Sequence, residues 1–109
     1  MASEVLKLAT FRGDAASVQA LLTVTAGHTY TVLSVTICET AGNAETIDLF
    51  IQDDGGADDY EILSDQAIGA NETYEHTGRI VLTNEDHLVA KTASAAAVDV
   101  VVSYLDQTR

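Results

Sequence analysis

The chain has 109 residues, enough for one domain with a single hydrophobic core. Its 17 acidic and 5 basic side chains give a formal net charge of -12, which excludes partners recognised through their phosphates, namely DNA, RNA and anionic membranes. Cys38 is the only cysteine, so no intrachain disulfide can form. No apolar stretch has the length of a signal peptide or a membrane span. We therefore expect a soluble protein made in a reducing cytoplasm.

The first segment, residues 4–11, reads EVLKLATF and is compatible with a strand or a helical turn. We predict an N-terminal arm or edge strand over residues 1–14, followed by a β-sandwich domain over residues 15–109. If residues 1–14 form an arm, the apolar side chains within it would contact a partner. The alternative is that the segment is the first strand of the sandwich. The candidate contact residues are Val5, Leu6, Leu8 and Phe11.

Alternation of apolar and polar residues predicts the next strands, over residues 18–25, 29–39 and 46–52. In the second of these the phase slips at Val32-Leu33, as a β-bulge or a change of sheet partner would produce. In the third, the apolar positions 47, 49 and 51 define the buried face. Phe50 then falls on the polar face, where it is either covered by a loop or a candidate subunit contact.

Short strands are predicted over residues 60–63, 66–68, 73–76, 79–82 and 88–92, and a longer strand over residues 98–105. In this last strand Val98, Val100, Val102 and Tyr104 alternate on the inner face. Val101 and Leu105 lie on the opposite face, where we expect a neighbouring subunit to cover them. The total of about eight strands predicts an all-β fold, an antiparallel, jelly-roll-like β-sandwich.

An acidic, glycine-containing loop occupies residues 53–59. Its carboxylates are the hard oxygen ligands that Ca²⁺ prefers, and the weak candidate ligands are Asp53, Asp54, Asp58 and Asp59. Their spacing does not match an EF-hand, so a solvated acidic loop is the favoured interpretation and no metal or other cofactor is predicted.

Catalytic motifs are not found in the sequence. His28, His76 and His87 show no HxH or HExxH spacing, and no serine or cysteine lies in a nucleophile-elbow context. We therefore predict a protein that is not an enzyme.

Four segments together resemble small virion proteins of tailed bacteriophages. The first is the hairpin over residues 22–51, with LTVTAG followed by YTVLSVTICETAGNAETIDLFI, similar to a family pattern that reads roughly "tVpaGtt…vvssI.icNtsgsaatvdLyi". AIGANET over residues 67–73 is similar to "ipanetl", and GRIVLTNEDHL over 78–88 to "giVLeaGDkL". ASAAAVDVVVSY over residues 93–104 is similar to "asaa.vdvtvsy".

The resemblance extends from residue 22 to residue 104, about three quarters of the chain, and rests on turns and alternation. The chain departs from it at Thr25, where the family often has proline, at Glu39, where asparagine is usual, and at Asn84-Glu85, where the turn commonly ends in glycine. These departures leave open which position in the particle this chain occupies.

The resemblance implies a virion protein, made in the host bacterial cytoplasm, that decorates the outside of the head as a capsid decoration (cement) protein. It also implies contact with the major capsid protein or other virion proteins, and a homo-oligomer, commonly a trimer. Two alternatives stay open. One is a neck, tail or head-fibre protein of the virion, and the other is a ligand- or calcium-binding β-sandwich module.

Overall fold

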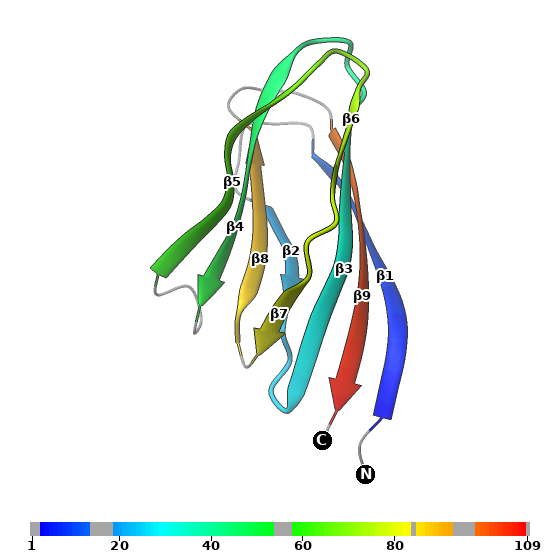
Figure 1. The fold of residues 1–109 in the computed structure, drawn as a ribbon, viewed down its shortest axis with the longest axis vertical. Helices are drawn as coiled ribbons and strands as arrows, with labels where there is room; N and C mark the ends of the chain where they lie inside the picture. The colour runs from blue at the N-terminus through cyan, green and yellow to red at the C-terminus, as the bar shows by residue number, and fades with distance from the viewer. Residues whose placement is uncertain (1–2, 14–18, 54–57, 84, 93–97, 109) are drawn as a thin grey trace.

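The computed structural model describes residues 3–13, 19–53, 58–83, 85–92 and 98–108. These residues form nine β-strands and no helix (Figure 1). No helix long and apolar enough to cross a membrane is therefore found in this part of the chain. The strands are β1 (Ser3–Gly13), β2 (Gln19–Thr23), β3 (His28–Glu39), β4 (Glu45–Asp53), β5 (Asp58–Ile68), β6 (Thr73–His76), β7 (Ile80–Thr83), β8 (His87–Thr92) and β9 (Val98–Thr108).

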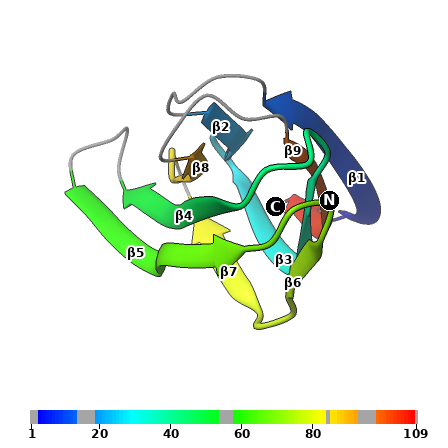
Figure 2. The same cartoon turned by 90° about the horizontal axis from the view of Figure 1, so that it is seen from above.

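The strands are arranged in two sheets that pack face to face (Figure 2). Sheet A has the order β1-β9-β3-β6, with β7 also paired to β3, and sheet B has the order β2-β8-β4-β5. Every pairing is antiparallel. The predicted all-β, antiparallel sandwich is confirmed, with nine strands where the sequence predicts about eight.

Strand β3 organises sheet A because it pairs on both sides. One side follows β9 along its whole length, and the other side pairs first with β7 and then with β6. The register with β9 shifts between Val32 and Ser34, so Leu33 is the extra residue of a bulge. The irregularity predicted from the phase slip at Val32-Leu33 is confirmed.

The core between the sheets is mainly aliphatic. Its centre consists of side chains that are fully buried and alternate along their strands. These are Val32, Val35, Ile37, Leu49, Leu82 and Leu88.

Strand β5 differs from the two short pieces predicted over residues 60–63 and 66–68. It is one strand, and its pairing with β4 shifts register between Ile47 and Leu49. Asp65 adopts a φ of 50° at this point, and its N–H donates to Asp48 Oδ1 at 2.6 Å. The gap between the two predicted pieces is therefore a bulge within a single strand.

The N-terminal segment lies at the edge of sheet A. Strand β1 pairs with β9 without interruption from Ser3 opposite Thr108 to Gly13 opposite Val98. Ala9 and Phe11 pack against the core from its inner face. Residues 3–13 are therefore part of the sandwich, and only one side of this strand is paired within its sheet.

Candidate functional site

A row of uncharged side chains crosses the outer face of sheet A. Leu6 on β1 lies opposite Leu105 on β9, which lies opposite Thr31 on β3, which in turn lies opposite Val81 on β7. Because side chains alternate along a strand, all four point away from the core. Four strands that are distant in sequence thus bring these residues into one line.

More apolar residues flank this row on the same face. Leu8 lies opposite Ser103, and Thr10 lies opposite Val101. Leu6, Leu8 and Val81 are 73%, 63% and 61% exposed. We call the apolar face the set of Leu6, Leu8, Leu33, Val81, Val101 and Leu105. Leu33, displaced by the bulge in β3, lines a shallow hollow beside Leu6 and Leu8.

Three carboxylates lie at the margins of the apolar face. Glu4 and Asp99 stand beyond Leu6 and Val101 on their strands, and Glu75 lies opposite Thr36. The Gln107 amide donates to Glu4 Oε1 at 3.0 Å, and the Thr36 hydroxyl donates to Glu75 Oε2 at 3.5 Å. The centre of the face is uncharged, which is unusual for a chain of net charge -12.

The outer face of sheet B has the opposite character. Asp48, Asp59, Glu61 and Asp65 gather there, with Lys91 opposite Asp48. Burial raises the pKa of Glu61, and the three neighbouring carboxylates raise it further, which shows that the negative charges are close together. Charge is thus segregated between the two outer faces of the sandwich.

The contact residues that the sequence analysis proposes in the first and last strands lie on two different faces of sheet A. Leu6 and Leu8 from the first segment join Val101 and Leu105 from the last strand on the apolar face. Val5 and Phe11 project from the other face of β1, where Val5 is 49% exposed and Phe11 packs on the core.

Phe50 does not lie at an exposed position. It is 5% exposed and stands opposite Val89, which is 1% exposed, on the outer side of sheet B. Of the two alternatives predicted for this ring, burial within the chain is the one observed. The alternation could not decide between the two, because it shows which face of the strand a residue occupies and not what covers that face.

A buried carboxylate ties β1, β3 and β9 together at one end of the sandwich. Lys7 Nζ lies 2.9 Å from Asp106 Oδ2, and His28 Nδ1 lies 2.7 Å from Asp106 Oδ1. Burial alone would raise the pKa of Asp106, but the hydrogen bonds to Lys7 and His28 lower it overall. The same contact raises the pKa of Lys7. The Tyr30 and Tyr104 rings pack beside it with centroids 4.9 Å apart.

A second buried carboxylate, Glu39, ties two turns together at the other end of β3. Its Oε1 accepts hydrogen bonds from the N–H groups of Gly42, Asn43 and Asn71 at 2.9, 3.0 and 3.1 Å, and its Oε2 accepts from Ala41 at 2.9 Å. The bond from Asn71 contributes most to lowering the pKa of Glu39, against the opposing effect of burial. Nothing in the sequence pattern signals these partners, which come from two separate loops.

The three histidines do not converge on one site. The histidines lie on three different strands, and His87 Nδ1 stands 3.2 Å from the Thr23 hydroxyl. Within the described ranges no three histidine, cysteine, aspartate or glutamate side chains are grouped as metal ligands.

Part of the predicted acidic loop, including Asp54, lies outside the described residues. Of its flanks, the Asp58 N–H donates to Asp53 Oδ1 at 3.2 Å. These two carboxylates raise the pKa of the Tyr60 phenol. Asp59 on β5 lies opposite Gln52 on β4 and contributes to the acidic outer face of sheet B.

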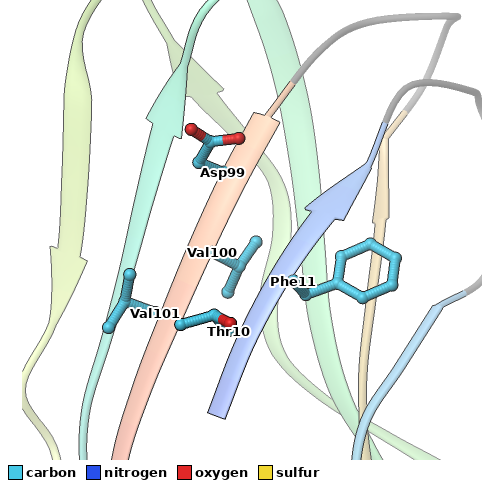
Figure 3. A pocket seen from close by; sticks show the side chains of 5 residues that line it. All are labelled: Thr10, Phe11, Asp99, Val100 and Val101. Atoms are coloured by element: carbon cyan, nitrogen blue, oxygen red, sulfur yellow. The ribbon is translucent and has the colours of Figure 1, made fainter. Parts of the chain in front are cut away.

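One surface hollow lies where β1 and β9 run side by side (Figure 3). Thr10, Phe11, Asp99, Val100 and Val101 line it, and Phe11 points away from Thr10 and Val101. Asp99 is the one titratable side chain among these five. The hollow therefore does not bring together a nucleophile, a base and an orienting group.

Comparison with known proteins identifies the fold. No protein-family model matches the chain, and no curated protein matches it. A protein in the capsid structure of Helicobacter pylori bacteriophage KHP30 is similar at a TM-score of 0.59 and 16% identity, over 96% of this chain and 93% of that one.

Two further solved structures share the fold. A protein of Bacillus endospore appendages, described as disulfide-linked pili, is similar at a TM-score of 0.59 and 10% identity, over 98% of this chain and 88% of that one. A protein of the infectious bursal disease virus Gx strain is similar at 0.53 and 9%, over 97% of this chain and 37% of that one. At these identities the likeness shows the fold alone, a β-sandwich found in viral particles and in a bacterial surface appendage.

Proposed function

We propose that the protein is a non-enzymatic structural component of a bacteriophage virion and that it decorates the outside of the head. The observation that carries the proposal is the likeness to a phage capsid protein over nearly the full length of both chains. The apolar face adds a surface suited to protein contact, and the acidic character of the chain disfavours a position against packaged DNA.

A decoration protein acts by adhesion. It bridges neighbouring subunits of the major capsid protein after the shell expands, and the apolar area buried at those contacts opposes the outward pressure of the DNA. The side chains proposed for contacts within the virion are the exposed Val5, Leu6, Leu8 and Val101 and the half-buried Leu105. Phe11 supports them from within, because it packs on the core beneath β1. We expect the chain to be made in the host cytoplasm and to act as a homo-oligomer, with three copies expected.

The test is co-sedimentation of the purified protein with emptied, expanded capsids of its own virus. We expect binding to expanded capsids, weaker binding to unexpanded ones, and none to naked DNA. Absence of binding to expanded capsids would refute the decoration role, and purified necks, tails and head fibres would then be tried as the alternative positions.

The choice of variant follows from the structure of β1. Deleting residues 2–11 would remove most of a strand that is paired along its whole length and carries Ala9 and Phe11 into the core. Such a deletion would weaken folding together with binding. Val5→Ser changes an exposed side chain and leaves the pairing intact, so reduced capsid binding by this variant at an unchanged melting temperature would support a contact through β1.

A further inference from the structure

We propose that the apolar face binds a second copy of this chain. This inference rests on the proposed function and deepens it, because it names the partner of that face. The exposed apolar side chains concentrate on one side of the molecule: Leu6, Leu8, Val81 and Val101 are four of the six large hydrophobic residues that are exposed in the described chain. Their registers place them on three strands of one sheet, β1, β9 and β7, with β3 between the last two.

The distribution of charge favours another copy over a different partner. Two chains of net charge -12 repel each other, and the repulsion is least where they meet through surfaces without carboxylates. The centre of the apolar face has no carboxylate, and Glu4, Asp99 and Glu75 stand only at its margins. The cluster of Asp48, Glu61 and Asp65 lies on the opposite layer of the sandwich. A basic partner would instead be attracted to that acidic layer.

The size of the face matches what a specific interface needs. Strands β1, β9 and β3 run side by side over eleven paired positions. With strands about 4.8 Å apart and a rise of about 3.4 Å per residue, the outer side of these three strands, charged margins included, covers roughly 14 by 37 Å, or about 500 Å² on each copy. Two such faces bury about 1,000 Å² in total, the lower bound for a specific interface. Strand β7 extends the area further.

The polar residues on this face do not oppose such a contact. Thr10, Thr31, Ser34, Thr36 and Ser103 carry hydroxyl groups, which can both donate and accept across an interface. A ring of three copies that each turn this face to a common axis would bury it, and so would a symmetric pair. The molecular mass of the complex distinguishes these two assemblies.

The experiment is sedimentation velocity of the purified chain in solution, without capsids, from micromolar to millimolar concentration. Leu8→Glu places a carboxylate at one margin of the apolar face, on β1, and Val81→Glu places one at the opposite margin, on β7. The matched control is Ala67→Glu, which adds the same charge to an exposed position on β5, in the other sheet of the sandwich. Melting curves of all variants check that the sandwich is intact.

We expect the wild type to self-associate and each of the two face variants to weaken association by about tenfold or more, because a carboxylate would be buried against an apolar surface. We expect the control to associate as the wild type does. A wild type that stays monomeric at millimolar concentration would overturn the inference, as would association that Leu8→Glu and Val81→Glu leave unchanged or that Ala67→Glu weakens equally. Since no capsid is present, such a result leaves the decoration role to be judged by capsid binding alone.

Discussion

Replacing Glu39 by glutamine tests whether one buried carboxylate holds two loops of the sandwich together. Glu39 is 1% exposed and accepts four backbone hydrogen bonds, three of them on Oε1. A glutamine oxygen can keep the three bonds from Gly42, Asn43 and Asn71. Its amide group would then face the Ala41 N–H, donor against donor, and the bonds that remain would lose their charge assistance.

We expect Glu39→Gln to lower the melting temperature at pH 7 by on the order of 10 °C, because one buried donor loses its partner and three bonds weaken. The effect should depend on pH. Since folding lowers the pKa of Glu39 from its ordinary 4.5, the ionised carboxylate stabilises the folded state above that value. This stabilisation is lost as the pH falls below 4.5 and through the folded-state pKa, so the difference between wild type and variant should shrink there.

The assay is thermal unfolding followed by circular dichroism between pH 7 and pH 2. Glu75→Gln is the matched control: it removes the same charge from an exposed position on β6, and its melting temperature should stay within a degree or two of the wild type. Equal effects of the two substitutions at pH 7, or a Glu39→Gln deficit that does not change with pH, would show that the bonds to the two loops are not what stabilises this end of the sandwich.

Three further outcomes are expected. Leu49→Ala, at a fully buried core position, should destabilise the fold by about 3 kcal/mol and lower the melting temperature by more than about 10 °C; a change under 2 °C would contradict the central place of this residue. Asp106→Asn should lower the melting temperature at pH 7 by weakening the contacts with Lys7 and His28. Because the pKa of Asp106 is lowered from 3.8, that deficit should shrink below about pH 4, and a deficit constant with pH would refute the ionic origin. Millimolar Ca²⁺ should raise the melting temperature no more than NaCl of equal ionic strength, whereas a ligand at 100 times its Kd would add about 2.7 kcal/mol; a specific rise of several degrees would indicate a metal site at the acidic loop over residues 53–59.

Local information in the sequence was sufficient for the fold class. The period of two in residues 46–52 assigns positions 47, 49 and 51 to the inner face correctly, and the slip at Val32-Leu33 marks a real bulge. These features follow from backbone geometry, because successive side chains of a strand point to opposite faces whatever the strand pairs with. The same information could not separate an arm from an edge strand at the N-terminus.

The tertiary structure alone decided which outward positions belong together. Leu6 and Leu105 are ninety-nine residues apart in the sequence, yet β1 and β9 place them opposite each other, and β3 then connects them to Val81. The covering of Phe50 and the partners of Glu39 and Asp106 are equally non-local. Alternation assigns a residue to one side of its own strand, but strand order and register determine its neighbours across the sheet, and these depend on the packing of the whole chain.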